Sequence, residues 1–196
     1  RCGAHPSALG AWDQELAASA VPLVEARTEA TAELAQPFNA AAAALGLEGD
    51  GAIAYRPRTG DLDLDGILAE LAARREGDLA RGYTGFGPHR DEVEISFGGR
   101  SLRRYGSQGQ QRLGLLALLF AERDALRRAR RQLPLMLLDD VMSELDPERR
   151  ERLAELLAGG GQALITATEA GHVPATAAPA RELEIAAGAA TGGEGA

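Results

Sequence analysis

Apolar and small side chains recur at intervals of three, four and seven residues along the first quarter of the chain, the spacing of one helical face. The pattern predicts a helix over residues 5–47. Pro22 and Pro37 are expected to kink or divide this helix, because proline lacks a backbone N–H group, and Gly46 and Gly49 are expected to end it. The recurring side chains are Trp12, Leu16, Leu23, Ala30, Leu34, Phe38 and Leu45.

The next segment predicts one short strand and a second helix. The stretch "GAIAYRP" (51–57) favours a strand, "RTGDLDLDG" (58–66) a loop, and "ILAELAARREGDLARG" (67–82) a shorter helix. No catalytic or ligand-binding motif is recognisable in this segment. Residues 1–81 are therefore expected to form a mostly helical arm or packing module.

After residue 82 the hydrophobic pattern changes from helical spacing to strand-like alternation. Val93, Ile95 and Phe97 alternate with polar residues, which predicts a strand, and the two glycines that follow predict a hairpin turn. A long helix is expected over residues 108–131, because a continuous apolar and charged pattern without proline runs through it.

Two short apolar runs follow, at 133–140 ("LPLMLLDD") and 162–168 ("QALITAT"). Both are typical of fully buried parallel strands. A helix with proline in its first turn is expected between them, over 147–159. Residues 180–188 alternate as an edge strand does, and 189–196 are expected to be a disordered tail. The alternation of helix and strand predicts an α/β fold with a parallel sheet.

Composition narrows the class of protein. The chain has 196 residues, 45% of them hydrophobic, and a net charge of −8, which argues against a surface that is basic throughout. One cysteine excludes an internal disulfide and fits a reducing compartment. No stretch approaches the ~20 apolar residues of a membrane span. The first residue is Arg1 and no signal-peptide pattern follows, so we expect a piece of a longer chain.

Asp139 and Asp140 end the first apolar run. Carboxylates at the carboxyl edge of a parallel sheet lie where α/β folds bind ligands. Adjacent carboxylates repel unless a cation or proton shares the site, and hydrated Mg²⁺ between protein and phosphates resolves this. On this interpretation Asp139 holds Mg²⁺ and Asp140 polarises the water that attacks a terminal phosphate. The alternative is two acids that cap a strand or the next helix.

The polar stretch "RYGSQGQQR" (104–112) precedes the long helix. Ser107 stands where an N-cap belongs. The first amides of a helix are unpaired and carry the positive end of its dipole, and Gly106 and Gly109 let a ligand approach the backbone. The stretch therefore predicts an anion site suited to phosphate. The alternative is an ordinary capped helix in a tight turn.

The order of these motifs resembles that of ABC/SMC-type ATPases, in which a signature loop, a helix, a Walker B strand and a D-loop follow one another. The sequence motifs "GPHRDE", "YGSQGQQR", "LMLLDDVMSELDPERR" and "ITAT", in this order, resemble the C-terminal part of the RecF family of bacterial recombination proteins. The segment "WDQELA" also resembles that family's second lobe, so the likeness covers most of the chain.

The resemblance implies a division of the chain. Residues 1–81 would be part of a helical arm, the second lobe. Residues 82–188 would be the C-terminal half of an ABC/SMC-type P-loop ATPase head, and 189–196 a tail. The chain has no lysine, so the P-loop motif GxxxxGK[ST] is absent and only part of an ATPase site is present. We expect no detectable ATP binding or hydrolysis by the chain alone.

The resemblance also implies roles for individual residues. ATP with Mg²⁺ would lie between two head domains, and the signature turn of one would touch the γ-phosphate held by the other. Ser143 and Asp146 would line the dimer seam, and Thr168 would hydrogen-bond a phosphate. The signature-turn residues are Ser107, Gln108, Gly109 and Gln110.

The partners that the resemblance implies are DNA at single-strand gaps, a second copy of the chain, RecO and RecR, with loading of RecA in the bacterial cytoplasm at the nucleoid, as part of the response to DNA damage. Arg103 and Arg104 are the candidates for DNA phosphates. The arginines near the end of the long helix, at 127, 128, 130 and 131, instead favour its dipole.

Other interpretations remain open from the residues. A different SMC- or ABC-type ATPase would carry similar motifs, although the helical segment is short and poorly heptad-like. A non-enzymatic adaptor that dimerises through the leucine-rich helix is a second alternative. A metal-dependent phosphatase or nuclease is weaker, because no further His/Asp cluster has suitable spacing. His89 and His172 receive no chemical role, and an Arg–Asp pair would explain "GPHRDE" as a stabilised turn.

Overall fold

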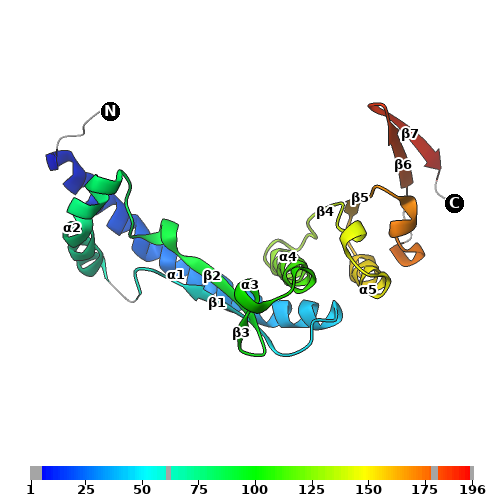
Figure 1. Cartoon of the computed structure of the whole chain (residues 1–196), viewed down its shortest axis with the longest axis horizontal. Coiled ribbons are helices and arrows are strands. Elements are labelled where there is room, and N and C mark those ends of the chain that lie inside the picture. Colours follow the sequence, from blue (N-terminus) through cyan, green and yellow to red (C-terminus); the bar gives the residue numbers. More distant parts are fainter. Residues whose placement is uncertain (1–5, 61–62, 178–180, 195–196) are drawn as a thin grey trace.

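The computed structural model describes residues 6–60, 63–177 and 181–194. The molecule is elongated (Figure 1). A long helix, α1, lies along a small antiparallel sheet in one half, α4 and α5 occupy the other half, and a β-hairpin projects at the C-terminal end. The chain is therefore mixed α/β, as the sequence predicts.

Helix α1 (Pro6–Ala44) runs without interruption through Pro22 and Pro37. Of the two expected effects, a kink or a division, division is therefore wrong. Each proline removes one backbone hydrogen bond. Packing on both sides compensates: Ala17 and Ala20 are buried near one end of the helix, and Phe38 is buried near the other. The chain leaves the helix through Gly46, which adopts a left-handed φ of 79°.

The small sheet has the order β1 (Gly51–Arg56), β2 (Glu92–Phe97) and β3 (Arg100–Ser101), all antiparallel. The predicted strands and hairpin turn are confirmed. Gly98 and Gly99 both have positive φ, 54° and 74°, as a tight two-residue turn requires. The sheet is joined to α1 through the rings of Phe38 and Phe97, whose centroids lie 5.7 Å apart.

Helix α2 (Leu64–Arg81) begins at Asp63, whose carboxylate accepts a hydrogen bond from Gly66 N, and ends at Gly82 with φ 79°. It packs against the first half of α1 and forms a small second core. The buried members of this core are Ala17, Ala20, Ile67, Leu71 and Phe86.

The rest of the chain is built around α4 (Gln108–Arg130), which follows the single turn α3 (Leu102–Tyr105). Strands β4 (Met136–Asp139) and β5 (Ala163–Thr166) are parallel, with α5 (Pro147–Ala158) between them along the chain. The main core joins these elements to the end of α1, so residues before and after 81 share it. Its buried members are Phe38, Ala41, Ala42, Leu45, Leu47, Leu113, Leu116, Ala117, Phe120, Ala121, Leu138, Met142, Leu145 and Leu153.

The expectation that β4 and β5 are fully buried is wrong for this chain. Leu137 and Leu164 lie opposite each other in register and are 66% and 57% exposed. Leu138, on the other face of β4, is buried in the main core. The two strands form a ribbon with one covered face and one uncovered apolar face, because no other described strand of the chain pairs with them.

The C-terminal strands also depart from expectation. The predicted edge strand is present as β6 (Arg181–Ala186), and it pairs with β7 (Ala189–Glu194) in an antiparallel hairpin. Residues 189–194 are therefore a strand and not the expected tail; 195–196 lie outside the described residues. Leu183 and Ile185 alternate with glutamates along β6 and are 48% and 74% exposed.

None of the helices in the described ranges has the length and apolar character that crossing a membrane requires.

Candidate functional site

Ser107 is exposed and caps α4, as the sequence predicts. Its Oγ accepts a hydrogen bond from Gln110 N at 3.2 Å, and Gln110 Oε1 accepts one from Ser107 N at 2.9 Å. This reciprocal capping box satisfies two backbone donors at the start of the helix. The serine and the glutamine therefore fix the turn without a ligand, so the start of the helix is already formed when a ligand binds.

The capping box also decides which donors stay available for an anion. Gln110 N is used by the cap, and Gln111 N donates to Ser107 O at 2.9 Å. The amides of Gln108 and Gly109 donate to no other group within the part of the chain that the structure describes. Two backbone N–H groups thus remain at the positive end of a 23-residue helix, which is the arrangement that binds phosphate elsewhere.

The turn before Ser107 is held by close packing around Leu102. A Cβ at Gly106 would stand 2.6 Å from the carbonyl oxygen of Leu102, and a Cβ at Gly114 would stand 2.3 Å from its Cδ2 atom. Leu102 is buried. The absence of a side chain at residues 106 and 114 is what lets α3 lie against α4, and Gln111 Nε2 further donates to Gly106 O at 3.0 Å.

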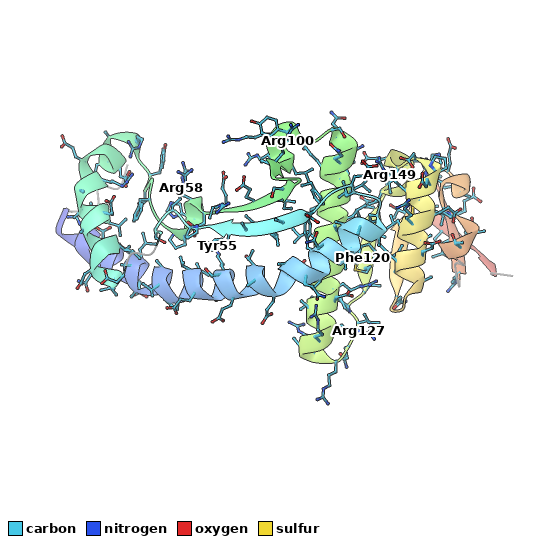
Figure 2. All side chains as sticks on the ribbon, turned by 90° about the horizontal axis from the view of Figure 1, so that it is seen from below. Tyr55, Arg58, Arg100, Phe120, Arg127 and Arg149 are labelled. Carbon is cyan, nitrogen blue, oxygen red and sulfur yellow. The ribbon has the colours of Figure 1, made fainter. Side chains whose placement is uncertain are left out.

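The signature turn lies beside the segment that follows the acidic pair. Arg112 Nη2 and Glu144 Oε1 are 2.6 Å apart. Arg149 Nη1 lies 3.5 Å from the place of a Cβ at Gly109 and 3.2 Å from Asp146 Oδ2. Figure 2 shows Arg149 beside the end of α4 that is opposite Arg127. Arg149 therefore lies between the turn at 107–110 and Asp146, which share one surface.

Asp146 has a second task, because it is the N-cap of α5 and accepts a hydrogen bond from Arg149 N at 3.0 Å. Sequence reasoning missed Arg149. Its position three residues after an N-cap aspartate offers a weak signal, since a charged side chain there can pair with the cap, but its proximity to Gly109 depends on the tertiary fold.

Asp139 and Asp140 lie at the carboxyl end of β4, as predicted, and both are exposed. Thr166, at the end of β5, lies directly opposite Asp139 in the parallel register, and its hydroxyl donates to Asp139 Oδ1. Ser143 Oγ donates to Asp140 O at 2.8 Å. These four residues therefore form one connected group around the end of the strand.

Thr168 does not join this group. It is exposed and its side chain makes no hydrogen bond to the described residues, whereas Thr166 occupies the place next to the acids. Sequence reasoning missed Thr166, because the register of two parallel strands decides which threonine meets Asp139, and the register cannot be read from one strand alone.

The acidic pair fits Mg²⁺ only together with phosphates. No cluster of three or more metal-binding side chains occurs within residues 6–60, 63–177 and 181–194. Mg²⁺ characteristically takes one or two carboxylates and completes its octahedron with water and phosphate oxygens. Asp139 and Asp140 supply that number of carboxylates at an exposed sheet edge, so the donor set suits a cation that arrives with a nucleotide.

The arginines on α3 lie next to the signature turn. Arg103 Nη1 is 3.5 Å from Glu92 Oε1, with both side chains largely exposed, and Arg104 is exposed as well. A solvent-exposed pair of this kind contributes little to stability, so Arg103 is available to other anions. Arg127 and Arg128 lie at the opposite end of α4, on its last turn, where the dipole favours them.

In the motif "GPHRDE", Asp91 stabilises the turn through its hydrogen bonds. Its partners are not the neighbouring Arg90, which the sequence suggested. The side chain of Asp91 is only 2% exposed. It accepts hydrogen bonds from Tyr55 Oη, from Arg58 N at 2.7 Å and from Arg27 Nη1 at 3.4 Å. Arg27 also donates to Pro88 O at 2.7 Å. Burial and the hydrogen bond to Asp91 raise the pKa of Tyr55 above its ordinary value.

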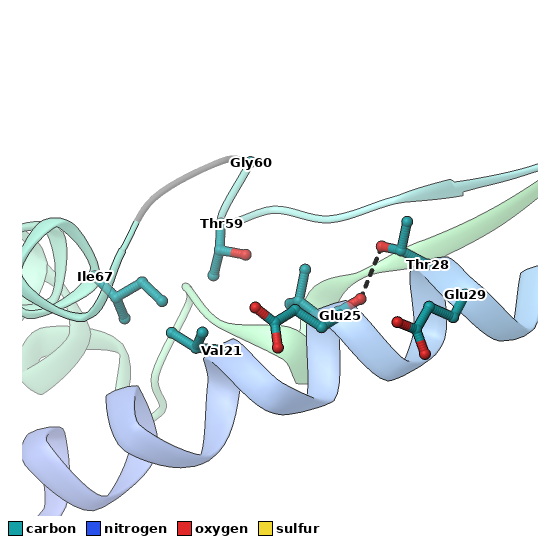
Figure 3. A pocket seen from close by; sticks show the side chains of 8 residues that line it. Val21, Glu25, Thr28, Glu29, Thr59, Gly60 and Ile67 are labelled. Atoms are coloured by element: carbon teal, nitrogen blue, oxygen red, sulfur yellow. Dashed lines mark hydrogen bonds between the residues drawn. The ribbon is translucent and has the colours of Figure 1, made fainter.

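A pocket of about 390 Å³ lies away from all of these residues, between α1 and the segment that leads into α2 (Figure 3). Glu25 and Glu29 give its wall an acidic character, which is unsuited to phosphate. None of the site residues predicted from the sequence lines it. The lining residues are Val21, Val24, Glu25, Thr28, Glu29, Thr59, Gly60 and Ile67.

Comparison with solved structures defines the class of protein. The chain matches an SMC head bound to the C-terminal winged-helix domain of ScpA with a TM-score of 0.52 at 16% identity, over 84% of this chain and 43% of that one. It matches the recombination mediator protein RecF-ATPrS with a TM-score of 0.78 at 28% identity, over 97% of this chain and 52% of that one. The fold is that of part of an ABC/SMC-type ATPase head.

Sequence identity to curated relatives identifies the family of the chain. The chain is 42% identical over 182 residues to the DNA replication and repair protein RecF of Myxococcus xanthus, covering 87% of this chain and 48% of the relative. It is 39% identical over 183 residues to RecF of Streptomyces avermitilis, covering 89% and 48%. The chain belongs to the RecF family. It spans about half the length of the curated relatives it matches, and corresponds to their C-terminal part. No family model matches the chain.

Proposed function

We propose that this chain supplies the signature half of a composite ATP site, and that it works in DNA repair. The signature turn of one copy would close on the γ-phosphate of ATP held by a second copy. The observation that carries the proposal is the exposed capped turn at Ser107, with the amides of Gln108 and Gly109 free and with Asp146 and Arg149 at its side. Gln110 and Ser107 add a side-chain amide and a hydroxyl as neutral donors.

The acidic edge serves the chain's own nucleotide in this proposal. Asp139 would hold Mg²⁺, directly or through water, and Asp140 would orient and polarise the attacking water. The cation supplies charge neutralisation on the phosphates when it is bound. Ser143 keeps the backbone after Asp140 in place through its 2.8 Å hydrogen bond to Asp140 O and lies, with Asp146, on the side that faces the second copy. Thr168 stays a candidate for a phosphate contact.

The chain alone would lack half of this site. It has no lysine and therefore no P-loop of the standard kind. The uncovered leucine face of β4 and β5 and the exposed side chains of β6 support the same conclusion, since they are apolar surfaces without a partner in the described chain. In the longer relatives, the other half of the head would cover them. Two solved relatives are named RecF-ATP and RecF-ATPrS.

Bound ATP would stabilise the dimer of two copies. A γ-phosphate provides the contact for the signature turn, and hydrolysis removes it, so nucleotide state shifts the monomer–dimer equilibrium. Membership of the RecF family, and the likeness to a recombination mediator protein of the RecFOR pathway, support a role at gapped DNA with RecO and RecR, leading to RecA loading at the bacterial nucleoid. Residues 1–81 would serve as part of the second lobe and 82–188 as the C-terminal half of the head.

The test joins the chain to the missing half of the Myxococcus xanthus relative and measures self-association by sedimentation, with and without ATP and Mg²⁺. The joined protein should dimerise only with ATP. Ser107→Arg should abolish the ATP-dependent dimer, because the larger side chain fills the phosphate position, whereas Ser19→Arg at an exposed position of α1 should not. A Ser107→Arg protein that dimerises with ATP as the parent does would refute the proposal.

A further inference from the structure

Thr166 makes two side-chain hydrogen bonds at the end of β5, and both involve the acidic pair. Its hydroxyl donates to Asp139 Oδ1 and accepts a hydrogen bond from Asp140 N at 3.0 Å. The single oxygen atom of a hydroxyl can donate one hydrogen bond and accept another at once. One oxygen atom therefore links the side chain of the first aspartate to the backbone of the second.

The second of these bonds acts on an unusual backbone. Asp140 has a φ of 49°, in the left-handed region that residues other than glycine seldom adopt. Such a conformation is strained and persists only where its surroundings hold it. Asp140 N also donates to the carbonyl oxygen of Thr166 at 3.2 Å, and Ser143 Oγ binds Asp140 O at 2.8 Å. Residue 140 is thus fixed on both sides of its Cα atom.

The bond to Asp139 has a consequence for the cation. Oδ1 is occupied by the Thr166 hydroxyl, while Oδ2 has no protein partner among the described residues. A carboxylate held in this way offers one oxygen in a fixed direction, as the outer hydrogen bonds of metal ligands usually do. A free carboxylate on an exposed strand end would rotate and lose entropy on binding.

We propose that Thr166 is the positioning residue of the metal and water site: it aims Asp139 Oδ2 at the cation and holds Asp140 in the left-handed conformation from which its carboxylate reaches water. The inference rests on the proposed function, because it assigns Thr166 a role toward the same Mg²⁺ and ATP. It goes beyond that function in naming the residue on which the alignment of both acids depends, two positions before the threonine that the sequence favoured.

Three variants separate this role from simple packing. Thr166→Val keeps the shape of the side chain but removes the hydroxyl, and Thr166→Ser keeps the hydroxyl but removes a methyl group. Thr168→Val removes a hydroxyl from the exposed neighbour, which makes no hydrogen bond to the described residues. If packing alone mattered, Thr166→Ser would be as damaging as Thr166→Val.

The first readout is hydrogen exchange of the Asp140 amide, measured by NMR on the whole chain. Thr166→Val should speed this exchange severalfold, since the amide loses its side-chain acceptor at 3.0 Å and keeps only the Thr166 carbonyl oxygen at 3.2 Å. Thr166→Ser and Thr168→Val should leave it near the parent rate. Circular dichroism establishes that each variant is folded. An Asp140 amide that exchanges at the parent rate in folded Thr166→Val overturns the inference.

The second readout is binding of Mn²⁺ in the presence of ATP, followed by electron paramagnetic resonance on the chain joined to the ATP-binding half of a relative. Loss of an outer hydrogen bond to a metal ligand typically weakens affinity about 10- to 100-fold, and we expect the lower end for Thr166→Val, with recovery in Thr166→Ser. Parent-like affinity in Thr166→Val overturns this inference alone. Failure of the parent itself to bind Mn²⁺ with ATP overturns the proposed function, and this role with it.

Discussion

Gly106 and Leu102 approach so closely that a single added methyl group at residue 106 would stand 2.6 Å from the Leu102 carbonyl oxygen. Backbone atoms cannot rotate away as a side chain can. Gly106 has an ordinary φ of −74°, so the need for glycine at this position is one of space and not of backbone conformation.

The first prediction follows from this contact. Gly106→Ala should lower the free energy of unfolding by about 1–3 kcal/mol, because the turn must shift to relieve the overlap. The measurement is urea denaturation followed by circular dichroism. Gly10→Ala is the matched control: nothing lies within 4 Å of its added Cβ inside α1, so it should raise stability by about 0.5–1 kcal/mol. Equal effects of the two substitutions would contradict the prediction.

A second prediction concerns the capping box. Ser107→Ala should lower the unfolding free energy by about 1 kcal/mol, since the Gln110 amide loses its acceptor. Gln110→Ala should remove the other half of the box, and the double variant should cost less than the sum of the two. Ser101→Ala is the control, because Ser101 precedes α3 without making a side-chain cap. Additive effects at residues 107 and 110 would show that the reciprocal pair is not formed.

The third prediction is a dependence on alkaline pH. The pKa of Tyr55 is raised by burial and by its bond to Asp91, so the folded protein holds the proton more tightly than the unfolded chain. The resulting stabilisation is complete below the unfolded pKa of about 10 and is lost as pH rises through the folded value. Tyr55→Phe should therefore differ most from the parent below pH 10, and the difference should shrink above it.

Denaturant titrations at pH 8, 10 and 11 would measure this difference. Tyr83→Phe serves as the control at pH 8, since it removes a hydroxyl from an exposed tyrosine; it should change the free energy of unfolding less than Tyr55→Phe does. A Tyr55→Phe difference that does not change from pH 8 to pH 11 would show that the hydroxyl is not bound to Asp91 in solution.

A fourth prediction tests Arg103 and Arg104 as DNA contacts in the protein that includes the missing half. Replacing both by alanine should weaken binding to gapped DNA and make the dependence of log affinity on log salt shallower by about 1–2. Fluorescence anisotropy at several salt concentrations measures both quantities. Arg127→Ala with Arg128→Ala removes the same charge from the opposite end of α4 and should change the slope less. An unchanged slope for the first pair would exclude this surface.

The fifth prediction is that the chain by itself binds no ATP that calorimetry can detect, because its sequence has no P-loop lysine to hold the phosphates. Addition of the purified ATP-binding half of a relative should restore binding if the two parts associate. Micromolar affinity in the isolated chain would overturn the expectation.

Local features of the fold were predictable, whereas long-range partners were not. The start of α4 follows from a serine with a glutamine three residues later, and the hairpin after β2 from two adjacent glycines. The arginine side chain that pairs with Asp91, by contrast, is Arg27, 64 residues earlier. The sequence suggested the adjacent Arg90 instead, because only nearby pairs are visible in a linear pattern.

The acidic site shows the same limit at finer scale. Asp139 and Asp140 follow from an apolar run that ends in two acids, and their place at a strand end is confirmed. Which threonine meets them depends on how β4 and β5 align, and Thr166 rather than Thr168 lies opposite Asp139. The apolar content of the strands predicted burial on both faces, but burial also needs a neighbour, which the described part of this chain does not provide for Leu137 and Leu164.

That leucine face has a practical consequence for anyone who expresses the chain. Within the part of the chain that the structure describes, no third strand pairs with β4 or β5, so both present unpaired backbone groups beside apolar side chains. Such an edge is a template for pairing with another extended polypeptide. At high concentration, copies of the chain that lack the other half of the head should therefore aggregate through these strand edges. Co-expression of that half from the same transcript should cover the strands before they aggregate.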